Sequence, residues 1–185
     1  MFPLLLLFLP ILASLLIFLL PGKLSRGVAM VSSIVSLTAV LLALNTLRLD
    51  AASGDLIFNM MWLPSLGSSL SFGIDGIAMV LLLLTNILFP LILLSTYNRE
   101  IYKPKAYFAF MLIMQLALLG VFMATDGLVF SIFCGLALIP IYLICLFCGG
   151  AGRQVIQFTF LIDTFRGGLV SLLELTMFAV ITTKH

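Results

Sequence analysis

Long, unbroken apolar stretches dominate this sequence. A bilayer core about 30 Å thick requires a helix of roughly 20 apolar residues. Inside hydrocarbon, a segment that is not part of a closed barrel must pair its own backbone groups, so such stretches form helices. Six stretches come close to that length or exceed it: Phe2–Leu20, Val28–Leu47, Ile77–Ser95, Tyr107–Ala124, Leu128–Phe147 and Val155–Ile181. We therefore predict an all-α, polytopic membrane bundle of about six transmembrane helices, with residues 1–185 as one domain.

The composition agrees with a lipid environment. Hydrophobic residues make up 63% of the chain and charged residues only 9%, whereas a soluble domain carries roughly a quarter charged residues. The net charge of +2 comes from few ionised groups. They lie mostly in short connections and form no basic stripe that could follow a phosphate backbone. We expect the lipid bilayer as a partner and no nucleic acid.

The charged connections also predict an orientation. Basic residues near span ends are retained on the cytoplasmic side. They occupy alternate connections here: Lys23 and Arg26, then Arg99, Lys103 and Lys105, then Arg153. The intervening connections carry Asp50, Asp55, Asp75 and Asp126, with Arg48 as their basic residue. This pattern places the N-terminus outside, and a bacterial inner (cytoplasmic) membrane is the expected location.

Two motifs carry a resemblance to a known family. The first is Trp62-Leu-Pro-Ser-Leu-Gly67 followed by Phe72-Gly-Ile-Asp-Gly-Ile77 and the run Leu81–Thr85, and the second is Leu136-Ala-Leu-Ile-Pro-Ile-Tyr142, which ends in Gly149-Gly150. Both are similar to the antiporter-like membrane subunits of respiratory complex I, NADH:quinone oxidoreductase. Within that family they most resemble subunit M, called subunit 4 in mitochondria. The resemblance covers most of residues 1–158.

The resemblance implies a non-redox subunit of the membrane arm, where proton translocation is coupled to electron transport elsewhere. It implies other membrane subunits of complex I and protons as partners, no cofactor in this chain and no active site of its own. It also implies a division into N-terminal spans and loop, residues 1–127, and the start of a proton-translocating module, residues 128–185. The family chain is more than twice as long, so we expect a fragment, a truncated paralogue or a decayed copy.

Two departures from the family pattern concern proton transfer. The family carries Trp-Glu directly before its Leu-x-Leu-Ile-Pro motif, and this chain has Cys134-Gly135 there. The family's lysine in the sixth span is replaced by Thr159. Glycine and threonine cannot titrate, so no catalytic residue is assigned. Besides a subunit that takes part in proton translocation, two alternatives stay open: a structural or assembly subunit that does not transport, and a subunit of a multisubunit cation/proton antiporter.

The sixth apolar stretch contains the ionisable residues that lie deepest in a span. At about 100° per residue, Asp163 and Glu174 fall nearly on one line of a helix, and Arg166 lies within about 60° of it. Such residues usually face the bundle interior or water. We consider them candidates for a proton path, and we favour a static ion pair between Asp163 and Arg166.

Two further features have modest interpretations. Asp75 precedes the third stretch, where a carboxylate can cap a helix N-terminus, and we favour this role over proton entry. Cys145 and Cys148 have the spacing of half a zinc site, but no second pair of ligands accompanies them, so we expect no metal and interpret them as small apolar side chains.

The orientation can be tested by cysteine labelling in intact cells after removal of the native cysteines. A cysteine at Asn98 or Gly152 should be shielded from an impermeant thiol reagent, because both positions lie in basic connections. A cysteine at Ser53 should be labelled. The reverse pattern of labelling would reject the predicted orientation.

Overall fold

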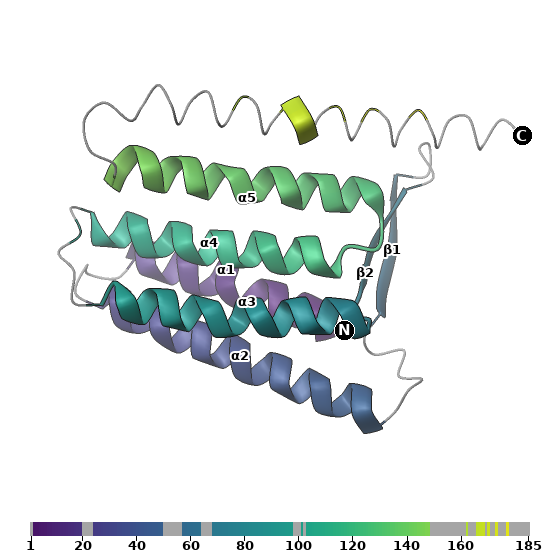
Figure 1. Cartoon of the computed structure of the whole chain (residues 1–185), viewed down its shortest axis with the longest axis horizontal. Coiled ribbons are helices and arrows are strands. Elements are labelled where there is room, and N and C mark those ends of the chain that lie inside the picture. Colours follow the sequence, from purple (N-terminus) through teal and green to yellow (C-terminus); the bar gives the residue numbers. More distant parts are fainter. Residues whose placement is uncertain are drawn as a thin grey trace, which may run out of the picture.

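The computed structural model describes residues 2–19, 24–49, 57–63, 68–97, 101 and 103–148, and single positions at 162, 166–168, 170, 173 and 177. Within the continuous ranges the chain forms five helices and one β-hairpin (Figure 1). The helices are α1 (Phe2–Leu19), α2 (Ser25–Leu49), α3 (Gly76–Ser95), α4 (Pro104–Met123) and α5 (Gly127–Cys148). The strands are β1 (Ile57–Leu63) and β2 (Ser68–Gly73).

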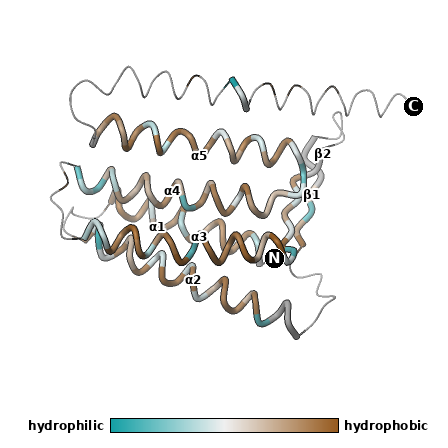
Figure 2. Tube along the Cα trace, in the orientation of Figure 1, coloured by the Kyte–Doolittle hydropathy of each residue, from teal (hydrophilic) through white to brown (hydrophobic). Residues whose placement is uncertain are grey.

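The helices have the character of membrane spans. Four are long and apolar enough to cross a bilayer, namely Ser25–Asn45, Gly76–Ser95, Pro104–Met123 and Gly127–Phe147, and Pro3–Leu19 is a shorter apolar helix. Apolar residues run along all of them (Figure 2), and large ones such as Leu19, 80% exposed, and Ile77, 74% exposed, point outward. The chain is therefore an integral membrane protein that is mostly helical. The predicted sixth span, Val155–Ile181, lies outside the described residues except for the single positions named above.

Helix α4 is the central element of the bundle. It packs against α1, α2, α3 and α5, and 56% of its span is buried, compared with 17% of the α5 span. One apolar cluster, with Leu6, Leu82 and Leu119, fills the hairpin end of the bundle. A second cluster, with Ile17 and Phe108, fills the opposite end. The packing surface of α5 is thus mainly the face it turns toward α4.

The β-hairpin corrects the all-α prediction. Strands β1 and β2 pair antiparallel, from Ile57 opposite Gly73 to Leu63 opposite Ser68, with an irregularity between Met61 and Leu63. Between Arg48 and Gly76 the sequence predicts only a connection between two spans. Each strand supplies hydrogen bonds that the other lacks. An isolated two-stranded hairpin is only marginally stable in water, so the hairpin also needs packing against the helices.

The hairpin is also joined to the helices. The backbone N–H of Thr125, between α4 and α5, donates to the backbone oxygen of Ser71 in β2 at 3.1 Å. The rings of Phe72 and Phe133 meet edge to face, with centroids 5.8 Å apart. Phe72 is only 2% exposed. The hairpin thus packs against α4 and α5 through β2, and β1 contacts α1.

Aspartates mark the starts of two helices at the hairpin end. The Asp75 carboxylate accepts the backbone N–H of Ala78 at 2.7 Å, which confirms the predicted N-cap of α3. The Asp126 carboxylate accepts the backbone N–H of Leu128 at 3.1 Å, at the start of α5. A carboxylate in this position satisfies an orphan donor and meets the positive end of the helix dipole.

Close contact between α4 and α5 depends on Gly120. A Cβ atom built at Gly120 would overlap the ring of Phe133. A Cβ atom built at Gly135 in α5 would meet nothing within 4 Å. Gly120 therefore lets the two helices approach closely, as small residues do in membrane bundles.

Gly120→Ala should destabilise the bundle by about 1–3 kcal/mol, the usual cost of overpacking a core. The measurement is thermal unfolding of the purified full chain in detergent. Gly135→Ala is the matched control and should not destabilise the bundle, because a Cβ there meets nothing within 4 Å and alanine has the higher helix propensity. Adding Phe133→Leu to Gly120→Ala should recover part of the loss. Equal stability of the two alanine variants would contradict the close contact.

Candidate functional site

A group of buried polar side chains lies between the two apolar clusters. Ser33 and Ser36 come from α2, Asn86 from α3 and Gln115 from α4, and each is 0% exposed. All four lie near the middle of their helices. In a membrane-spanning bundle this level is the centre of the hydrocarbon, where polar groups need partners within the protein. We refer to these four residues as the polar centre.

Hydrogen bonds connect the polar centre across three helices. The Oδ1 atom of Asn86 accepts from Ser36 Oγ at 2.6 Å and from Gln115 Nε2 at 3.0 Å. Ser33 Oγ donates to Gln115 Oε1 at 3.3 Å. Asn86 also donates through Nδ2 to the backbone oxygen of Leu82, one turn earlier in α3, at 2.8 Å. Asn86 is thus the residue through which α2 and α4 are both linked to α3.

The sequence of α2 makes these bonds possible. Five of its buried positions recur at intervals of four and three residues and are small: Ala29, Ser33, Ser36, Val40 and Ala43. Small residues on one face let neighbouring backbones approach. The short serine side chains can therefore reach amides on α3 and α4.

The polar centre has the chemistry of a clamp between helices. Hydroxyl and carboxamide groups donate and accept hydrogen bonds but do not titrate near neutral pH. No buried polar atom of these four residues lacks a partner. A fully satisfied network in low dielectric holds its members in place and fixes their register. It supplies no acid or base of its own.

The predicted site residues fall in other places. Arg166 is helical and exposed, while Asp163, Glu174 and Thr159 lie outside the described residues. The ion pair between Asp163 and Arg166, and the alignment of both with Glu174 along one helix, therefore stay predictions. Gly135, which the resemblance predicts at the position of the family's glutamate, is half-buried in α5, and a Cβ atom built there would meet nothing within 4 Å.

The described part of the chain gives no support for a metal site at the cysteines. Cys134 is exposed and Cys145 is half-buried, and both are free thiols. Among the described residues no three His, Cys, Asp or Glu side chains gather closely enough to hold a metal ion. The side chain of Cys148 lies outside the described part.

The polar centre was not predicted from the sequence, although the sequence contains a signal for it. Three apolar stretches each carry hydroxyl or amide residues near their middle: Ser32, Ser33 and Ser36, then Thr85 and Asn86, then Gln115. Their coincident depth could have suggested a contact. The prediction of site residues rested on ionisable groups, and these residues are neutral.

Comparisons with known proteins find relatives that are named subunit M of a dehydrogenase or chain 4 of a quinone oxidoreductase. The chain is 36% identical over 151 residues to F(420)H(2) dehydrogenase subunit M of Methanosarcina mazei. It is 38% identical over 115 residues to NAD(P)H-quinone oxidoreductase chain 4 of Prochlorococcus marinus, strain MIT 9312. It is 32% identical over 164 residues to NAD(P)H-quinone oxidoreductase chain 4 1 of Picosynechococcus. No family model matches the sequence.

These alignments cover much of this chain but a minor part of each relative. They include 82%, 62% and 86% of this chain, in the same order. They span 30%, 21% and 30% of the respective relatives. The chain thus matches less than a third of the length of each of these proteins.

Replacing the central amide should loosen the bundle. Asn86→Leu removes the acceptor for Ser36 and Gln115, and at about 0.6–1.7 kcal/mol for each interhelical bond the loss should be about 1–3 kcal/mol. The control is Thr85→Val: Thr85 is also buried, but its hydroxyl bonds only to Leu81 O within α3. Thermal unfolding of the full chain in detergent measures both. A loss from Thr85→Val as large as that from Asn86→Leu would show that the interhelical bonds contribute nothing.

Proposed function

Because the chain is homologous to subunit M and chain 4 of these dehydrogenases, we propose that it serves as a membrane-arm subunit of a quinone oxidoreductase of the complex I type. The observation that carries the proposal is the 36% identity over 151 residues to F(420)H(2) dehydrogenase subunit M. Identity at this level across 82% of the chain supports the same helices in the same order. Other membrane subunits of such a complex are the proposed partners.

We further propose six spans with the N-terminus outside, in a bacterial inner membrane. The charge distribution of the described part supports this orientation. The first turns of α2 and α4, with Arg26 and Lys105, lie at the end of the bundle away from the hairpin (Figure 1), and Lys103 directly precedes α4. Asp75 and Asp126 directly precede α3 and α5, which start at the hairpin end. The positive end is expected to face the cytoplasm.

Within such an arm, the proposed role of the described helices is structural. The polar centre links α2, α3 and α4 through groups that do not titrate. Gly135 provides no carboxylate on α5. The bundle of residues 1–127 would then be a rigid support, and residues 128–185 the beginning of the module next to which protons move. Proton transfer itself would rely on residues of partner subunits or on the stripe of Asp163, Arg166 and Glu174.

The proposal can be tested by following the tagged chain in the membranes of its own host. After mild solubilisation and native electrophoresis, the chain should migrate with a large complex that contains other membrane subunits and oxidoreductase activity toward quinone. The control is an unrelated polytopic protein carrying the same tag. Migration as a single small band would reject the proposal, and co-migration with subunits of a cation/proton antiporter would favour that alternative.

A further inference from the structure

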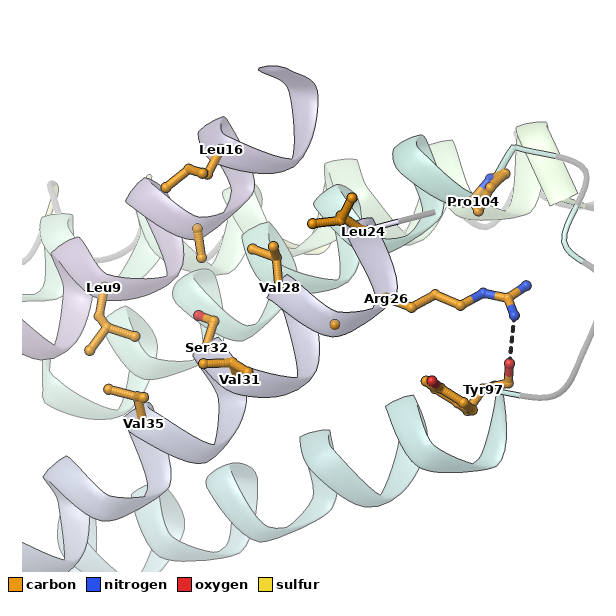
Figure 3. Close-up of a pocket in the computed structure, with 12 residues that line it drawn as sticks. Leu9, Leu16, Leu24, Arg26, Val28, Val31, Ser32, Val35, Tyr97 and Pro104 are labelled. Carbon is orange, nitrogen blue, oxygen red and sulfur yellow. Dashed lines mark hydrogen bonds between the residues drawn. The ribbon is translucent and has the colours of Figure 1, made fainter. Parts of the chain in front are cut away.

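A groove of about 1340 Å³ runs between α1 and α2 on the outside of the bundle (Figure 3). Its walls are apolar: Leu9, Ala13 and Leu16 come from α1, and Val28, Val31 and Val35 come from α2. Its rim is open, since Leu16 is 48% and Val31 is 61% exposed. Compact ligand pockets usually measure roughly 300–1000 Å³ and enclose their ligand. This groove is larger and open along its side, which suits a long, flexible, apolar ligand.

The length and depth of the groove match one leaflet of a bilayer. Along α2 the lining extends from Leu24 to Val35, which at 1.5 Å per residue is about 16 Å. Half of a hydrocarbon core is about 15 Å. The groove starts at the N-terminus of α2 and stops near the middle of that helix. A single acyl chain of one leaflet would fill it.

A positive charge marks the outer end of the groove. Arg26 lies in the first turn of α2, and its Nη1 donates to the backbone oxygen of Tyr97 at 2.7 Å, as drawn in Figure 3. Tyr97 follows the C-terminus of α3, so the bond holds the guanidinium beside the groove. A cation in the first turn of its own helix adds to the positive end of that helix dipole. An anion at this end of α2 would be stabilised by the guanidinium of Arg26 and by the helix dipole.

We propose that the groove between α1 and α2 is a binding site for an anionic phospholipid. The phosphate lies at Arg26 and Tyr97, and one acyl chain runs along Leu16, Val28 and Val31 toward the centre of the membrane. The guanidinium makes the site selective, because it prefers a phosphate without a neutralising choline. The site adds a lipid partner to the chain and does not depend on the proposed oxidoreductase role.

The test uses the full chain in phosphatidylcholine vesicles that contain brominated phosphatidylglycerol or, in parallel, brominated phosphatidylcholine. Trp62, the single native tryptophan, is changed to Phe, and a reporter is introduced as Val31→Trp in the groove. Leu88→Trp is the control reporter, at a similar depth on the exposed side of α3. Leu16→Trp probes the opposite wall if Val31→Trp does not fold.

The groove reporter should be quenched about fivefold more effectively by the anionic lipid, the effect of one basic residue near a membrane surface. The control reporter should show no preference. Arg26→Gln should bring the groove reporter to parity, whereas Lys105→Gln, which removes an equal charge outside the groove, should leave the preference in place. Equal quenching by both lipids would overturn the proposal. A groove reporter protected from both lipids, beside a control that is quenched, would also overturn it and would indicate a covering helix or subunit.

Discussion

The absence of water from the bilayer core is the constraint on which this structure depends. Every backbone group and every polar side chain at that depth must find its partner within the protein. The apolar stretches therefore fold as helices, and the strands β1 and β2 occur only beyond the helix ends, in the connection between α2 and α3. The same constraint explains why Asn86 bonds both Ser36 and Gln115 instead of facing lipid.

Apolar packing and polar pairing have different tasks in this bundle. The clusters around Leu119 and Phe108 bring helices together at either end, but apolar contacts alone tolerate sliding of one helix along another. Hydrogen bonds to Asn86 tolerate much less, because a shift by one residue would separate donor from acceptor. Positioned between the clusters, the polar centre fixes the relative height of α2, α3 and α4, and α4 passes that register on to α1 and α5.

Sequence patterns predicted the helices well because each span is specified by its own residues. The starts and ends of α1 to α5 lie within a few residues of the predicted stretches, and the Asp75 cap is local by nature. The hairpin and the polar centre were missed because both arise between segments. Ser71 pairs with Asn59 across the hairpin and accepts a hydrogen bond from Thr125, and Gln115 differs from a lipid-facing glutamine only by the neighbours it meets.

The contact between β2 and the turn after α4 also has a mechanical consequence. Strand β2 leads into α3 through only two residues, Ile74 and Asp75, and on its other side it holds Thr125 and Phe133 at the junction of α4 and α5. A tilt of α5 would therefore act on the hairpin as on a lever and be transmitted to the first turn of α3. Helix α4 contacts both α3 and α5 inside the bundle, and the hairpin adds a second connection between these two helices at the end of the bundle.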